Sequence, residues 1–377
     1  MSLPPDAALF ARILAKTNEY LDFPSVVGHE TPYLDHLARD FEALGAGVER
    51  PRNLCVVRLG GAKAGEGPVY LAHVDRHGAV TDEDGAPVYA AHAVKNSKYG
   101  DASTPSADFA EAISKRYAGE EMFAYDRKTG GRIAYGDVTG AKLDADNRLV
   151  FTLKDMPPLA PGTPLAFARK LDRSQVGYVT GQLDNPISAA ALRVAAEFGL
   201  KGTIVFTAEE EIGRSAEHFL TWAQAGGLKP GRELIVLDTT PFDDGAAALA
   251  GAVILRRRDA TARFDPEAVR RLETAASGGG APIIFKDSFI DRENDARARR
   301  GQTPKSMGLT ELGRIARDSD GRYTGATLQV PTFNYHSNNE STTPRALTAF
   351  VRTLAAVGTS YGQHPARQLA LSEQQPP

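Results

Sequence analysis

The stretch TIVFTAEEEIG, residues 203–213, decides the fold that we expect for this chain. Its first five residues are all β-branched or aromatic, a composition that favours a buried strand. Apolar residues at helical spacing over 187–198 and 215–225 predict a helix on either side, and a second strand is expected at 233–237, which contains the apolar run LIVL. This alternation of helices and strands predicts an α/β fold with at least some parallel strands.

Segments farther from this stretch fit the same architecture. Helical spacing is present near the N-terminus, over 31–44 and from residue 344 onward. Short β-prone runs predict further strands at 54–59, 69–72, 252–255, 282–285 and 328–335. The fold class that we expect is therefore α/β, with a mixed, partly parallel sheet and helices on both of its faces.

The region 78–173 differs in composition and predicts a second, smaller domain. It is rich in Gly, Asp and Pro, with β-prone pieces such as RIAYGDV and RLVFTLK and one helical stretch near 109–117. A single elaborate domain with long loops is the alternative, but roughly 90 residues without regular structure are uncommon in a compact fold. We expect a catalytic domain formed by residues 1–77 and 174–362 and an inserted β-rich domain over 78–173 for assembly and pocket shaping. The tail over 363–377 is expected to be disordered.

The composition is that of a soluble globular protein and disfavours one class of partner. The chain has 377 residues, of which 42% are hydrophobic and 24% charged. Its net charge of −3 and pI near 6.3 argue against nucleic acid as the main partner. The run RRR at 256–258 is expected to be a solvated strand end rather than a binding patch.

The same reading predicts a cytoplasmic protein with no membrane partner. The N-terminus lacks the basic segment and continuous apolar core of a secretory signal. No stretch approaches the ~20 apolar residues needed to span a bilayer. The single cysteine, Cys55, excludes an internal disulfide and fits a reducing compartment.

Six acidic or histidine residues stand at the ends of apolar runs or in the turns beside them. In open α/β sheets, ligands bind beyond the carboxyl ends of the strands, so residues far apart in sequence can meet there. These side chains are hard or borderline ligands that suit Zn, Co or Mn, and they lack the thiolates of many structural zinc sites. They predict a two-metal hydrolase centre and are His73, Asp184, Glu210, Glu211, Asp238 and His336.

Each of these residues also has an ordinary structural interpretation. Glu210 and Glu211 would point to opposite faces in a strand, and they can share a site only if the chain turns there. One could then bind metal and the other act as a base; otherwise, the glutamates form a solvated helix start. Asp75 could orient the imidazole of His73, whereas His77 is a weaker candidate that lines the site. Asp184 could simply cap a helix, and Asp238 and His336 could be ordinary turn residues.

The order of these motifs resembles a known family. HxD at 73–75, LDN at 183–185, EEIG at 210–213, a strand-end Asp238 and a late His–Ser pair are similar to the co-catalytic metallo-aminopeptidases. Within that clan, the chain most resembles the tetrahedral (glutamyl) aminopeptidase type, because His73 and Asp184 are 111 residues apart. FPSVVGHE near the N-terminus and PGTPLAFARK at 161–170 are also similar to segments of that family.

The resemblance implies a function and a role for each residue. The activity would be removal of N-terminal amino acids from peptides by a homo-oligomer carrying two divalent ions per chain, Zn first and Co or Mn as alternatives. Glu210 would be the general base, and Asp75 would steer His73. One ion would be held by His73, Asp184 and Asp238, and the other by Asp184, Glu211 and His336, with Asp184 bridging the two.

The chain also departs from the family at several positions. Arg76 stands where relatives usually carry an acidic residue, and Pro186 and Ile187 follow the LDN turn. A cation near the site would favour a substrate carboxylate, so a same-fold amidohydrolase or deacylase acting on a modified amino acid or small peptide is the alternative. A catalytically inactive, metal-retaining assembly or binding protein is a second alternative, and glycan cleavage by paired carboxylates is a remote one.

Overall fold

The computed structural model describes residues 3–60, 67–91, 105–168, 170–173 and 177–360, and the statements below concern these ranges. The predicted disordered tail over 363–377 lies outside them. Within these ranges, no helix combines the length and the apolar character that crossing a membrane requires.

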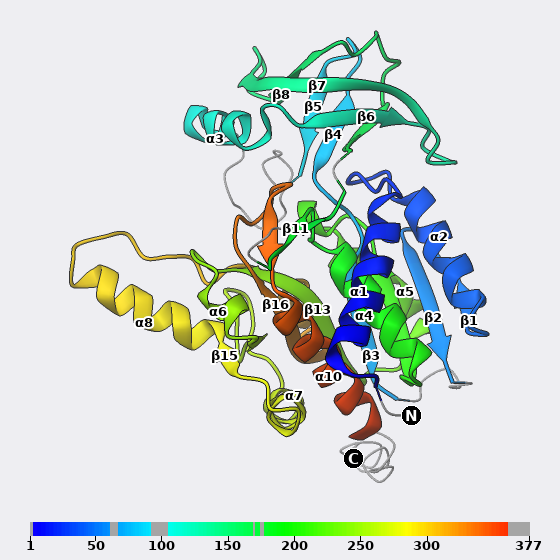
Figure 1. The fold of residues 1–377 in the computed structure, drawn as a ribbon, viewed down its shortest axis with the longest axis vertical. Coiled ribbons are helices and arrows are strands. Elements are labelled where there is room, and N and C mark those ends of the chain that lie inside the picture. Colours follow the sequence, from blue (N-terminus) through cyan, green and yellow to red (C-terminus); the bar gives the residue numbers. More distant parts are fainter. Residues whose placement is uncertain (1–2, 61–66, 92–104, 169, 174–176, 361–377) are drawn as a thin grey trace, which may run out of the picture.

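An eight-stranded mixed sheet forms the centre of the larger part of the molecule (Figure 1). Its middle strands β12, β3, β13 and β16 run parallel to one another. At one edge, β2 is antiparallel to β12, and β1 is antiparallel to β2. The predicted fold class, a mixed and partly parallel sheet, is confirmed. In spatial order the strands are β1 (Gly47–Glu49), β2 (Leu54–Leu59), β12 (Gly202–Thr207), β3 (Val69–His73), β13 (Glu233–Pro241), β16 (Thr324–Thr332), β14 (Val253–Leu255) and β15 (Ile283–Phe285).

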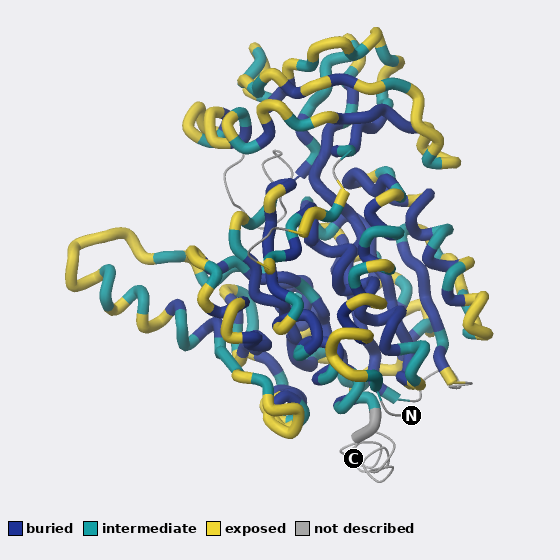
Figure 2. The backbone as a smooth tube through the Cα atoms, viewed as in Figure 1, coloured by how far each residue is buried: buried dark blue, intermediate teal, exposed yellow. Residues whose placement is uncertain are grey.

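Helices cover both faces of this sheet, as predicted. One group packs together and includes α1 (Asp6–Leu21), α2 (Thr31–Glu42), α4 (Pro186–Glu197), α7 (Pro266–Gly278) and α10 (Pro344–Ser360). The other group consists of α5 (Ser215–Trp222) and α9 (Glu311–Asp318), which pack together against the middle strands. The middle strands are consequently buried on both sides, and every residue of β3 and β12 is buried (Figure 2).

A closed six-stranded barrel stands beyond one end of the sheet (Figure 1). The helix α3 (Ala107–Tyr117) packs on β7, and the Tyr117 ring stacks on Phe167 at 4.3 Å in the barrel core. All barrel strands lie within 78–173, while the predicted role of this region in assembly stays a prediction. The strands are β4 (Gly78–Thr81), β5 (Pro87–Ala90), β6 (Glu121–Tyr125), β7 (Arg132–Leu143), β8 (Leu149–Lys154) and β9 (Pro164–Phe167).

Smaller elements complete the fold. A three-stranded sheet of β10 (Asp172–Arg173), β11 (Val179–Gly181) and β17 (Glu340–Thr342) lies between the barrel and the main sheet (Figure 1). The short α6 (Ala246–Leu249) follows β13, and α8 (Lys286–Ala298) projects from the body.

One expectation about surface charge is wrong for one residue of the run at 256–258, because Arg257 is exposed but Arg256 is not. Arg256, from the run expected at a solvated strand end, is 5% exposed. Its guanidinium donates to Gln329 Oε1 at 2.8 Å, to Thr240 Oγ1 at 3.1 Å and to the Met307 carbonyl at 2.7 Å. Arginine can be buried when its fork of donors is satisfied in this way, so this side chain ties β14 to β13 and β16.

Candidate metal centre

The parallel strands bring the predicted acidic and histidine residues to one end of the sheet. His73 ends β3 and pairs in register with Thr207, the last residue of β12, after which Glu210 and Glu211 follow. Asp238 lies on the neighbouring β13. This end is where strand carboxyl termini meet, the usual ligand-binding edge of an open α/β sheet.

The first group of side chains consists of His73, Asp184 and Asp238. His73 Nε2 is 3.0 Å from Asp184 Oδ1 and 3.5 Å from Asp238 Oδ1. One ligand atom from each residue lies within 4.8 Å of the others. All three are residues that the sequence assigned to one metal.

The second group consists of His77, Glu211 and His336, whose ligand atoms also lie within 4.8 Å of one another. His336 Nε2 is 3.6 Å from Glu211 Oε1 and 3.3 Å from Asp184 Oδ2. Asp184 therefore directs one carboxylate oxygen toward each group, the arrangement that a bridging ligand needs. His77, expected only to line the site, has its Nε2 3.1 Å from Glu211 Oε2.

A sharp turn after β12 allows both glutamates to reach the centre. Glu209 adopts a left-handed conformation with φ of 62°, and a 3₁₀ turn, Glu210–Ile212, follows before Gly213 at φ 76°. Non-glycine residues with positive φ are uncommon and occur where surrounding contacts hold them. The chain thus leaves the strand where the sequence argument required it to.

Asp75 holds this turn in place. Its two carboxylate oxygens accept the backbone N–H groups of Glu210 and Glu211, each at 2.9 Å. Asp75 Oδ1 is also 3.5 Å from His73 Nδ1. The residue expected only to steer His73 therefore connects the histidine with both glutamates.

Two residues that contact the candidate site were missed by sequence reasoning. Arg314 on α9 places Nη1 2.5 Å from Glu210 Oε1. Burial raises the pKa of Glu210 to about 8, and Arg314 opposes that rise. Glu340, at the start of β17, accepts the backbone N–H of Asp184 at 3.1 Å through Oε2. Neither residue lies in a motif whose spacing would have indicated its position.

The charges of the centre fit divalent cations. Burial alone lowers the pKa of His73 and His336, but surrounding carboxylates outweigh it, raising the pKa of His73 well above its usual value and that of His336 to about 9. Burial and the charge of Asp184 raise the pKa of Asp238, and they raise that of Glu340 to about 8. The protein alone therefore holds extra protons here, whereas divalent ions would balance the same negative charge.

Arg76, the departure next to Asp75, does not face this centre. Its side chain is buried and donates to Ser25 Oγ at 2.9 Å and to the Phe23 carbonyl. Its backbone pairs with Val26. The guanidinium therefore anchors the N-terminal segment around residues 23–26, and the hypothesis of a pocket-facing Arg76 is not supported.

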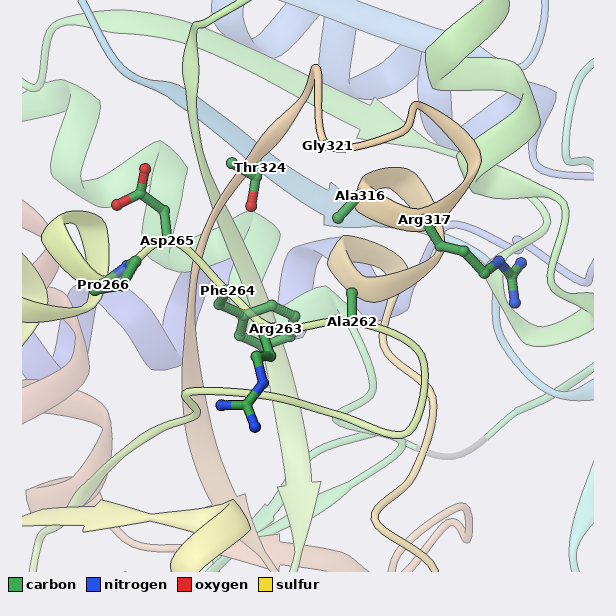
Figure 3. Close-up of a pocket in the computed structure, with 9 residues that line it drawn as sticks. All are labelled: Ala262, Arg263, Phe264, Asp265, Pro266, Ala316, Arg317, Gly321 and Thr324. Atoms are coloured by element: carbon green, nitrogen blue, oxygen red, sulfur yellow. The ribbon is translucent and has the colours of Figure 1, made fainter.

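A hollow of about 400 Å³ lies at the other end of the strands (Figure 3). Thr324, which lines it, pairs with Glu233 at the start of β13, whereas the metal-centre residue Asp238 is farther along that strand. Figure 3 shows that Arg263, Asp265 and Arg317 point in different directions around it. Ligand pockets usually have convergent polar groups, so this hollow is not part of the candidate site.

Comparisons with known proteins identify the fold. No protein-family model matches the sequence, and no curated protein matches it. The TET1 peptidase of Pyrococcus horikoshii, described as assembling into a tetrahedron or a large octahedral shell, matches at 18% identity and TM-score 0.64 over 92% of this chain and 99% of its own. Aminopeptidase APDkam598 of the archaeon Desulfurococcus kamchatkensis matches at 15% identity and TM-score 0.67 over 93% and 94%.

A third match carries another activity in its description. A protein described as an endoglucanase of Thermotoga maritima is 13% identical, with a TM-score of 0.59 over 92% of this chain and 99% of its own. Identities this low establish the fold alone. The chain has the fold of the tetrahedral aminopeptidases, as its sequence resemblance implied.

Proposed function

We propose that this protein is a two-metal aminopeptidase that removes N-terminal amino acids from peptides. The observation that carries the proposal is the pair of histidine–carboxylate groups that meet at Asp184, whose two oxygens lie 3.0 and 3.3 Å from His73 and His336. They occur within a fold shared with proteins described as aminopeptidases.

Two divalent ions would occupy these groups, with zinc the first choice and cobalt or manganese possible. When bound, a pair of such ions activates water as a nucleophile and stabilises charge that develops on the substrate carbonyl oxygen. His73 and Asp238 would hold one ion, Glu211 and His336 the other, and Asp184 both. Asp75 helps to fix two of these ligands, because it contacts His73 and holds the turn that carries Glu211.

Glu210 would be the general base. Arg314 engages Oε1 of its carboxylate, so Oε2 is the oxygen that would accept the proton of the attacking water and return it to the leaving amine. Asp75 holds the backbone N–H of Glu210, which keeps the carboxylate at the edge of the centre rather than in the strand. The two neighbouring glutamates would therefore have different roles: Glu211 would bind metal, and Glu210 would transfer the proton.

Other functions find less support in the structure. The amidohydrolase alternative depended on a pocket-facing Arg76, and that side chain instead binds Phe23 and Ser25. An inactive binding protein would need the proposed metal ligands but not the half-buried Glu210 beside them. Glycan cleavage needs two carboxyl groups across a glycosidic bond, whereas carboxylates here converge on histidines.

A substrate panel tests the proposal. The metal-loaded protein should hydrolyse amino-acid anilides and free dipeptides, leave N-acetylated counterparts intact and show no action on soluble cellulose. Chelation should abolish hydrolysis, and added zinc, cobalt or manganese should restore it. Preferential cleavage of the acetylated compounds would favour the deacylase alternative. Full activity after chelation would refute metal dependence.

We further infer that the chain forms a homo-oligomer through the barrel. β7 exposes two large apolar side chains, Ile133 at 58% and Tyr135 at 45%. Replacing residues 78–173 by a short linker should leave a smaller oligomer or a monomer with the main sheet folded, as measured by light scattering and circular dichroism. Assembly of the shortened protein to the parent size would place the contact surface elsewhere.

A further inference from the structure

His77 lies inside the metal centre, although the proposed assignment gives it no role. Its side chain is almost fully buried, with Nε2 3.1 Å from Glu211 Oε2 and the ring centroid 4.4 Å from that of His336. The ligand atoms of His77, Glu211 and His336 are as close to one another as those of His73, Asp184 and Asp238. Geometry therefore offers His77 to the same ion as Glu211 and His336.

Hydroxyl groups from the barrel region contact both His77 and His336. His77 Nδ1 contacts the hydroxyl of Tyr89 on β5. On α3, the Tyr117 hydroxyl donates to the His336 carbonyl at 2.7 Å. A tyrosine hydroxyl can both donate and accept, so the Tyr89 oxygen can accept a hydrogen bond from Nδ1–H of His77.

Metal binding would select one tautomer of His77. In that tautomer, Nδ1–H donates to the Tyr89 oxygen and Nε2 is the nitrogen that binds the ion. A neutral ring then carries its lone pair on Nε2, directed at a carboxylate oxygen of Glu211. Two acceptors at this separation need a proton or a metal ion between them, and a metal-bound histidine typically donates its other N–H to a partner such as Tyr89.

We propose that His77 is a ligand of the ion held by Glu211 and His336, with Tyr89 as its positioning residue; this rests on the proposed two-metal function. The ion then has four protein side chains, His77, Asp184, Glu211 and His336, against three for the ion at His73. The barrel also fixes His336, because Arg116 and Tyr117 both donate to its carbonyl. The ion at His77 should therefore be the last to leave on chelation.

Metal retention tests this directly. The full chain is loaded with zinc, and both dissociation constants are measured by competition with a chelator, with metal content followed by elemental analysis. His77→Gln should weaken one ion only, by more than about 100-fold, the upper end of the effect expected for an outer partner. Tyr89→Phe, which removes one oxygen, should weaken the same ion by about 10- to 100-fold. The matched control is His36→Gln, on α2 away from the centre.

The absorption spectrum of bound cobalt is a second readout. Substitution of a residue that only lines the site would leave this spectrum unchanged. The visible absorption of the cobalt-loaded protein should shift in His77→Gln and stay as in the parent in His36→Gln. Retention of both ions at parent affinity with an unchanged cobalt spectrum in His77→Gln overturns the inference alone. A parent that binds two ions without hydrolysing peptides overturns the proposed function alone, and a parent that binds no ion overturns both.

Discussion

Two regions of the molecule gather histidine with carboxylates, and they differ in what balances the negative charge. On α1 and α2, Glu19, His36 and Asp40 bring ligand atoms within 4.8 Å of one another, as the metal-centre residues do. Lys16 Nζ lies 2.7 Å from Glu19 and 3.2 Å from Asp40, and Arg193 Nε lies 3.1 Å from Asp40. In the metal centre, Asp184 and Asp238 form their ion pairs with histidines, as far as the described part of the chain shows.

The pKa shifts of one aspartate from each region, Asp40 and Asp238, report the same difference. Burial tends to raise the pKa of Asp40, but the Tyr20 hydroxyl, Arg193 and Lys16 bring it below its usual value. Burial and a neighbouring carboxylate leave the pKa of Asp238 raised. Residue types alone therefore do not identify a metal site. The cluster on α1 and α2 already has ammonium and guanidinium partners, whereas the ion pairs of Asp184 and Asp238 are with histidines, and divalent ions would balance their charge.

Removal of the shared carboxylate tests this difference most severely. Asp184→Ala should lose both ions and essentially all activity, because Asp184 faces both histidine groups. Asp40→Ala removes a carboxylate from the other cluster and should keep about two ions per chain. Elemental analysis of the two purified variants distinguishes them, and two tightly held ions in Asp184→Ala would refute the bridging role.

Glu210→Gln separates chemistry from metal binding. The variant should keep about two ions per chain and lose about 10²–10⁴ in kcat, the usual contribution of a general acid–base group. The amide cannot accept the proton of water, while Glu211 beside it still binds metal. Peptide hydrolysis is measured together with metal content, and a variant that keeps most of its activity contradicts the assignment.

The two clusters should affect stability in opposite pH windows when metal is removed. His336, with its pKa raised to about 9, contributes stability that is present below its unfolded value near 6.5 and lost as pH rises through 9, worth up to about 3 kcal/mol. Asp40, with a lowered pKa, contributes stability that is present above about pH 4 and lost on acidification. Melting temperatures in a chelator should fall from pH 6.5 to 9 for the parent and fall less for His336→Gln.

The smallest effect is expected at Lys16. Lys16→Met removes the ammonium that pairs with Glu19 and Asp40, at a cost of about 1 kcal/mol in the free energy of unfolding, because the groups are only half-buried. Metal content and activity should not change. Urea denaturation gives the stability, and acquisition of a third zinc ion by this variant would show that the lysine is what excludes metal from the cluster.

The sequence predicted the parallel centre of the fold and missed several helices outside it. The runs 204–206 and 234–237 are apolar throughout, because their strands are buried on both faces. The helices α7, α8 and α9 were not predicted. α8 carries charge on most of its surface and has no clear apolar face. α9 is only eight residues long, although Thr310 caps it and accepts the Gly313 N–H.

The sequence likewise predicted only some residues of the candidate site. Residues in motifs, such as His73 and Glu211, could be named because a short pattern after an apolar run marks the carboxyl end of a strand. Arg314 and Glu340 could not, because nothing local indicates which distant helix or loop reaches the centre. His77 was undervalued for a related reason: its partner Tyr89 belongs to the barrel, and one sequence does not show how the barrel packs.

The contacts from α3 to His336 have a consequence for the order in which the molecule acquires its properties during folding. Arg116 and Tyr117 reach a carbonyl about 220 positions away in the chain, at a residue held with φ of 55°. Contacts between such distant positions carry a large loop-closure entropy and tend to form late. A refolding chain should therefore regain its helical circular dichroism before it can retain zinc, so the ability to bind metal would report arrival at the native state.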